Sequence, residues 1–188
     1  MNRIAVLAGV ASATIVASVA SADFTSVVWT LNDNTITTSA FDPFFAAEKF
    51  AGTESVLGPT SSGGSGSLTS STMTTIGGDA SANGLTWYST IATASYTVSV
   101  DWEFSTTDAA DFDAAGWVLN GVFTKLAGSD GNGTVTFSVN AGDTYGFGTA
   151  TADGQFGAAT TVFTNFVPAP GAVGLLAMAG IVGSRRRR

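Results

Sequence analysis

Hydrophobic and polar residues alternate most clearly over residues 96–104, YTVSVDWEF. Because successive side chains of a strand point to opposite faces of a sheet, this alternation predicts a strand with one buried and one solvated face. Residues 134–139 alternate in the same way. Shorter runs rich in β-branched and aromatic residues predict further strands at 84–92, 145–151 and 159–166.

Turn-forming residues separate these strands. Asn120-Gly121 stands between the two apolar runs of residues 116–126 and predicts a hairpin, because both residues accept the positive φ of a type I′ turn. Asn32 to Asn34 predict the turn of a first hairpin between residues 27–31 and 35–38. Further turn signals lie at 129–133, 140–143 and 153–154.

The spacing of about eight short strands, with almost no helix, predicts an all-β fold: an antiparallel β-sandwich of jelly-roll type over residues 23–166. Residues 41–50, FDPFFAAEKF, predict a short helix that covers one end of the core, with Pro43 at its first position. Residues 60–67, TSSGGSGS, are low in complexity, and their composition predicts a flexible loop within the domain.

The first 22 residues have the layout of a secretory signal peptide. Arg3 is followed by an apolar stretch over residues 4–19, and the small residues Ala20 and Ala22 stand at the third and first positions before the predicted cut. Signal peptidase accepts small residues there, so we expect cleavage after Ala22 and export of the remainder. The apolar stretch is expected to form a signal helix outside the folded domain.

The end of the chain, residues 167–188, has three zones. A Gly/Ala/Leu-rich apolar run up to Gly183 separates a proline motif from a basic cluster; the motif is Val167, Pro168, Ala169 and Pro170, and the cluster is Arg185, Arg186, Arg187 and Arg188. The run can form a helix in lipid, where backbone groups must pair internally, and the arginines resist transfer through hydrocarbon. This layout predicts membrane association through residues 171–188, with the arginines as a cytoplasmic stop.

A proline motif, a short apolar helix and a terminal arginine cluster in an exported protein resemble a PEP-CTERM sorting signal. The resemblance implies recognition by a membrane-embedded exosortase, a cysteine transpeptidase-like enzyme that cuts near the proline motif and passes the protein to the cell surface or extracellular matrix. The sequence departs from the family pattern at Ala169, where the motif has glutamate. A permanent inner-membrane anchor is the alternative, although the segment reaches the lower limit for spanning, roughly 17 residues, only when counted from Val167 to Gly183.

The charge distribution argues against nucleic acid as a partner. Arg3 and the four terminal arginines are five of the seven basic residues, so only Lys49 and Lys125 stand against all 14 acidic residues between the two terminal segments. Such a surface repels phosphate backbones and attracts divalent cations. The chain has no cysteine and no histidine, which excludes Ser-His-Asp and Cys-His catalysis and the usual zinc sites.

Carboxylate chemistry is the remaining route to an active site. Asp101 and Glu103 share the polar face of the predicted strand, roughly 6.6 Å apart along it, near the carboxylate spacing of inverting glycosidases. Solvated side chains on an exposed strand face are the competing interpretation, which we adopt. We therefore expect a protein that is not an enzyme.

The acidic loop of residues 107–115 is a candidate cation site. Asp108, Asp111 and Asp113 would supply carboxylate oxygens, which Ca²⁺ binds in flexible loops, although their spacing does not match an EF-hand. Asp and Asn are also favoured in turns without any metal. The same two interpretations apply to Asp130, Asn132 and Asp153. No cofactor other than this possible Ca²⁺ is expected.

Aromatic residues add one further binding hypothesis. Trp87, Tyr88, Trp117 and Tyr145 would form a platform for sugar rings if the sheets exposed them, but we expect most of them to pack in the core. Two functions therefore stay open. The first is a non-enzymatic exported protein of the cell surface or extracellular matrix, and the second is a carbohydrate- or calcium-dependent binding module with polysaccharide as a partner.

Overall fold

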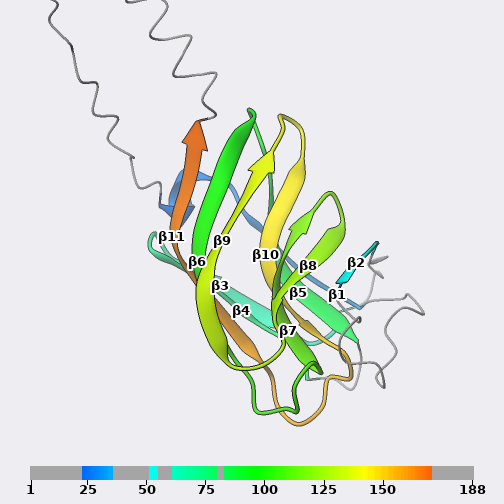
Figure 1. Cartoon of the computed structure of the whole chain (residues 1–188). Helices are drawn as coiled ribbons and strands as arrows, with labels where there is room; N and C mark the ends of the chain where they lie inside the picture. Colours follow the sequence, from blue (N-terminus) through cyan, green and yellow to red (C-terminus); the bar gives the residue numbers. More distant parts are fainter. Residues whose placement is uncertain (1–22, 36–50, 55–60, 80–82, 171–188) are drawn as a thin grey trace, which may run out of the picture.

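The computed structural model describes residues 23–35, 51–54, 61–79 and 83–170, which form two antiparallel sheets packed face to face (Figure 1). The sheets have the strand orders β1-β5-β10-β7-β8-β2 and β3-β4-β11-β6-β9. This architecture confirms the predicted all-β antiparallel sandwich of jelly-roll type. After a 3₁₀ turn, η1 (Phe24–Ser26), the strands are β1 (Thr30–Thr35), β2 (Ala51–Glu54), β3 (Ser65–Leu68), β4 (Thr72–Ile76), β5 (Gly84–Ile91), β6 (Tyr96–Ser105), β7 (Asp113–Leu119), β8 (Val122–Ala127), β9 (Gly131–Val139), β10 (Thr144–Thr151) and β11 (Thr160–Pro170).

The core between the two sheets is rich in aromatic side chains. Phe147 on β10 is fully buried, and its ring centroid lies 5.1 Å from that of Phe163 and 6.0 Å from that of Phe137, both on the other sheet. Trp29 meets Phe166 edge to face at 5.5 Å. Such aromatic pairs contribute roughly 0.5–1.5 kcal/mol each beyond their buried area. Burial of these rings stabilises a chain that has no cysteine for disulfides.

Local patterns predicted the central strands correctly. Residues 96–104 form most of β6, in which Val98, Val100 and Phe104 are buried and alternate with more exposed positions. Asn120 and Gly121 connect β7 to β8 with φ angles of 50° and 84°, as a type I′ turn requires.

The turn predicted at Asn32 to Asn34 is wrong, because these residues lie inside β1, which pairs with β5. Their polar side chains have partners there. The Asn32 amide donates a 2.8 Å hydrogen bond to the Ser89 hydroxyl, and Asp33 accepts a 3.2 Å hydrogen bond from the Ser62 N–H. In the described sheet β1 is an edge strand, and polar residues are common in edge strands.

The segment 60–67 was expected to be a flexible loop, but its described residues are held in place and lead into β3. Asp33 accepts hydrogen bonds from the hydroxyls of Ser61 and Ser62 as well as from the Ser62 N–H. A Cβ at Gly64 would lie 1.7 Å from the hydroxyl oxygen of Thr86 on β5. Gly64 therefore permits close packing, a role that composition alone does not distinguish from flexibility.

The sandwich extends beyond the predicted boundary at Phe166, because β11 continues to Pro170. The first part of β11 lies between β4 and β6, but its pairing with β4 stops at Thr164. Val167 to Pro170 pair with β6 alone. Proline lacks the N–H of a β-ladder and is confined to edge positions, so Pro168 fits a stretch with a single neighbouring strand.

The other predictions for the chain ends lie outside the described residues. They are the signal helix of residues 1–22 with its cleavage residues Ala20 and Ala22, the apolar run after Pro170, and the arginine cluster 185–188. The helix predicted at 41–50 also falls outside. Over the ranges that the structure does describe, none of the helical segments has the length and apolar character needed to cross a membrane.

Candidate functional site

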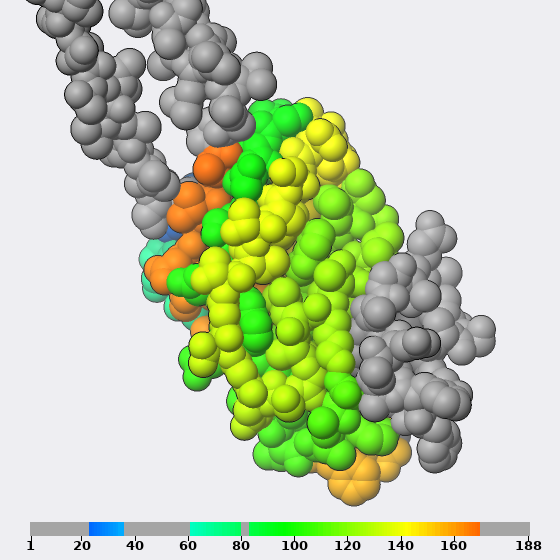
Figure 2. Space-filling view, in the orientation of Figure 1, coloured from blue at the N-terminus to red at the C-terminus, as the bar shows by residue number. Residues whose placement is uncertain are grey.

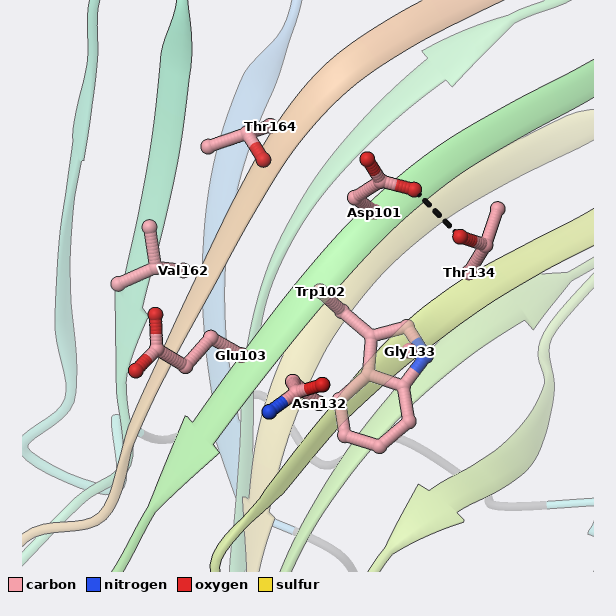
Figure 3. Close-up of a pocket in the computed structure, with 8 residues that line it drawn as sticks. All are labelled: Asp101, Trp102, Glu103, Asn132, Gly133, Thr134, Val162 and Thr164. Atoms are coloured by element: carbon pink, nitrogen blue, oxygen red, sulfur yellow. Dashed lines mark hydrogen bonds between the residues drawn. The ribbon is translucent and has the colours of Figure 1, made fainter.

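A hollow on the outer face of the five-stranded sheet is lined by residues of β11, β6 and β9. Figure 2 shows these three strands next to one another at the surface, in orange, green and yellow. The strand register places two rows of residues across it. The first row is Thr164, Asp101 and Thr134, and the second is Val162, Glu103 and Asn132. Trp102 and Gly133 complete the lining (Figure 3). Three segments far apart in the sequence thus meet at one site.

Asp101 is in the middle of the first row and connects both neighbouring strands. Its Oδ1 accepts a 2.5 Å hydrogen bond from the Thr134 hydroxyl on β9, and its Oδ2 accepts a 2.7 Å hydrogen bond from the Asn165 amide on β11. These hydrogen bonds lower the pKa of Asp101 against the small opposing effect of burial. At neutral pH the side chain is therefore a carboxylate that accepts hydrogen bonds. A general acid in glycoside hydrolysis needs a raised pKa instead.

Glu103 projects from the same face of β6 and is more exposed than Asp101. In Figure 3 its carboxylate lies toward Val162 on β11, with Asn132 on the other side. The Trp102 indole packs against Gly133, where an added Cβ would lie 3.1 Å from the ring. The hollow therefore presents two carboxylates, an amide and hydroxyls on paired strands, while the Trp102 ring packs against the core.

Sequence reasoning found part of this site. It predicted that Asp101 and Glu103 share a solvated face, and the structure places both in the hollow. Asn132 was assigned to a turn or a metal site, but it lies in β9, which begins at Gly131. Thr134 and Thr164 were missed, because only the strand register brings them beside Asp101.

The acidic loop between β6 and β7 does not bring the three predicted calcium ligands together. Asp111 forms an ion pair with Lys125 on β8. Asp113 is 1% exposed and accepts a 2.6 Å hydrogen bond from the Thr106 hydroxyl. Asp130 accepts a 2.8 Å hydrogen bond from the Thr106 N–H, as a turn residue does. Among the residues that the structure describes, no three acidic side chains are grouped so that they could hold a metal ion.

Asp113 nevertheless has an unusual environment. Burial raises its pKa, hydrogen bonds from Thr106 and Thr151 act in the opposite direction, and the nearby carboxylates of Asp108 and Asp153 raise it further. The Oδ2 atom of Asp108 is buried and has no hydrogen-bond partner among the described residues. Of the three predicted ligands, Asp108 therefore acts on Asp113, whereas Asp111 is paired with Lys125.

The aromatic residues considered for a sugar platform are packed into the domain. Trp87, Tyr88 and Tyr145 are at most 7% exposed. The Trp117 ring stacks on Phe137 with centroids 4.1 Å apart. The structure therefore confirms core packing for these residues, and they form no platform for sugar rings. Among the described residues, an exposed aromatic ring is instead found at Phe156, at 75%, in the connection between β10 and β11.

Comparisons with known proteins identify no family. No protein-family model matches the chain, and no curated protein matches it. Among solved structures, a native family 35 carbohydrate binding module from Clostridium thermocellum matches with a TM-score of 0.34 and 13% identity, over 54% of this chain and 88% of that one. An arabinose-bound α-L-arabinofuranosidase matches with a TM-score of 0.29 and 12% identity, over 74% of this chain and 27% of that one. Likenesses at this level carry no argument about function.

Proposed function

We propose that the chain is an exported, non-enzymatic protein of the cell surface or extracellular matrix. Signal peptidase removes residues 1–22, and residues 171–188 hold the protein in the inner membrane. An exosortase then recognises the proline motif at 167–170 and transfers the β-sandwich to its destination. The sandwich is the cargo, and the two terminal segments direct its delivery.

The position of the sandwich between the two terminal segments carries this proposal. Phe24 follows the predicted cut after Ala22, is 1% exposed and stacks on Phe166 at 5.1 Å. The core therefore begins just after the predicted signal peptide, and β11 ends at Pro170, where the apolar run starts. Removing either terminal segment leaves these core rings in the domain.

The environment of Asp101 supports a role without catalysis. An inverting glycosidase needs one protonated carboxyl as general acid and a second carboxylate as base. Hydrogen bonds from Thr134 and Asn165 occupy both Asp101 oxygens and lower its pKa, so the group is ionised at neutral pH. Asp101 is therefore not tuned to donate a proton in such a pair.

Intact-mass analysis of the protein recovered from its own cells tests the delivery proposal. We expect a polypeptide that begins at Asp23 and has lost the arginine cluster, recovered from the cell surface or the medium. Replacing Arg185 to Arg188 by serine should prevent this processing, whereas replacement by lysine should preserve it because the positive charge remains. Recovery of the unprocessed chain from the cytosol would contradict the proposal.

A second function, polysaccharide binding at the cell surface, is favoured by the hollow. Sugar hydroxyls form hydrogen bonds with carboxylates and amides, and the hollow presents Glu103 and Asn132 on neighbouring strands. Its carboxylates favour neutral or amine-bearing glycans and disfavour uronic acids, since like charges repel. In this case the domain would bind polysaccharide of the extracellular matrix after its delivery there.

Affinity electrophoresis in gels that contain a neutral or an acidic polysaccharide tests this second function. The full chain should migrate more slowly in the neutral gel, and E103Q and N132A should lose the retardation. S138A is the matched control, because Ser138 is exposed on β9 but does not line the hollow. Equal retardation of all four proteins, each measured against its own mobility in a gel without polysaccharide, would exclude the hollow as a glycan site.

A further inference from the structure

Two exposed aliphatic side chains lie together near one end of the sandwich. Val28, between η1 and β1, is 86% exposed, and Ile91, at the end of β5, is 63% exposed. They line a shallow groove whose other lining residues carry no charge: Thr30, Ser89, Thr90 and Thr144. We call these two side chains and the groove the Val28–Ile91 patch.

The backbone around Val28 fixes its outward orientation. Phe24 is buried on one side of it, and the Trp29 indole on the other side donates a 2.9 Å hydrogen bond to the Phe24 carbonyl oxygen. The Trp29 ring also packs on Tyr145 at 5.7 Å. Because the Phe24 and Trp29 rings are both fixed against the core, the Val28 side chain between them stays exposed.

The Val28–Ile91 patch lies at the end of the sandwich where β11 finishes. Ile91 pairs with Thr144, the first residue of β10. The next residue, Tyr145, makes a 3.0 Å hydroxyl–hydroxyl hydrogen bond with Tyr96, and Tyr96 pairs with Pro170. Figure 1 shows the end of β11 and the β9–β10 turn at the same end of the sandwich. The apolar run of residues 171–183 continues directly from that end.

We propose that the Val28–Ile91 patch rests on the lipid surface of the membrane while residues 171–188 hold the chain there. This inference depends on the membrane attachment in the proposed function. Since Pro170 directly precedes the apolar run, the end of the sandwich that carries the patch is the end nearest the bilayer. An uncharged groove between two aliphatic side chains suits the boundary between headgroups and acyl chains.

Site-specific fluorescence in vesicles tests the contact. The chain has no cysteine, so V28C, I91C and F156C each carry one thiol for a polarity-sensitive dye. Phe156 is the matched control, because it is a similarly exposed apolar residue at 75% and lies in the connection that follows the far end of β10. Each labelled full-length chain is reconstituted into phosphatidylcholine vesicles with nitroxide-labelled headgroups.

Lipid contact predicts a shift to shorter wavelength and strong nitroxide quenching at residues 28 and 91, with neither effect at residue 156. Equal, weak quenching at all three positions would overturn the inference. A wavelength shift at 28 and 91 that grows with protein concentration and is not quenched by nitroxide lipid would assign the patch to a second copy of the chain instead. Failure of the chain to float with the vesicles would refute the membrane attachment itself.

Discussion

Asp101 on β6 and Asn165 on β11 are joined by a 2.7 Å hydrogen bond from the Asn165 amide to the Asp101 carboxylate. Asn165 has a φ of 51°, and the register of β11 against β6 shifts between Thr164 and Val167. The residues form a β-bulge, which inserts one extra residue and changes which side chains face inward. As a result Phe166 is buried in the core while Asn165 stays at the surface.

Replacing Asp101 by alanine tests the importance of this connection. D101A removes the hydrogen bonds from Thr134 and Asn165, each worth roughly 0.5–1.5 kcal/mol, so we expect the free energy of unfolding to fall by about 1–2 kcal/mol. Chemical denaturation measures the change. E103A is the control on the same strand face and should change stability by less than about 0.5 kcal/mol. If D101A and E103A lowered the free energy of unfolding equally, the hydrogen bonds to Asp101 would not be important for stability.

The sequence predicted features that depend on neighbouring residues and missed those that depend on distant ones. The alternation in β6 and the turn at Asn120 are local, and both were predicted correctly. Asp33 was misassigned because its partner Ser62 lies 29 residues away, and the Asp101–Asn165 contact spans 64 residues. Strand register decides such pairs, and no local pattern encodes it.

Gly64 provides a second test, because the structure assigns it to packing. A Cβ there would lie 1.7 Å from the Thr86 hydroxyl oxygen and 2.9 Å from the Ile76 carbonyl oxygen. Overpacking of this kind costs about 1–3 kcal/mol, so G64A should lower the thermal midpoint clearly. G131A is the matched control, since an added Cβ there meets nothing closer than 3.7 Å. If G64A were as stable as G131A, the segment would be flexible as its composition suggested.

The buried carboxyl of Asp113 predicts a pH dependence. Its pKa is raised above the ordinary value of 3.8, chiefly by burial, so the folded state binds the proton more tightly than the unfolded state. Asp113 therefore favours the fold most at low pH, and this contribution is lost as pH rises from 3.8 through the folded pKa. Because D113N cannot ionise, its unfolding free energy relative to the parent protein should increase across that range. Urea titrations at several pH values measure this difference.

Asp33 supplies a control of opposite sign for that experiment. Burial opposes its ionisation, but the hydroxyls of Ser61 and Ser62 donate hydrogen bonds that lower its pKa below 3.8. Its contribution to stability is present above 3.8 and is lost as pH falls through the folded pKa. D33N should therefore have a lower free energy of unfolding than the parent protein above pH 3.8, and this difference should shrink below pH 3.8. The same trend in D33N and D113N would show that global charge, rather than these sites, controls the pH dependence.

The last prediction concerns the order of unpairing and cleavage at the proline motif. Val167 to Pro170 pair with β6 residues Ser99 to Tyr96, so an enzyme that cuts within the motif must first take it out of the sheet. Phe166, 1% exposed, would remain in the core and limit how far the strand peels away. A disulfide between the facing residues in T97C/A169C should therefore block removal of the C-terminal segment, residues 171–188.

A disulfide across the pair in S105C/T160C is the matched control, because it joins the same two strands on the other side of the bulge. We expect this variant to be processed like the parent protein, and reduction of the T97C/A169C disulfide should restore cleavage. Intact mass reports both results. Tail removal in oxidised T97C/A169C would show that the enzyme cuts after Pro170 and leaves the motif paired with β6. The bulge at Asn165, which keeps Phe166 in the core, would then matter only for packing and would not limit processing.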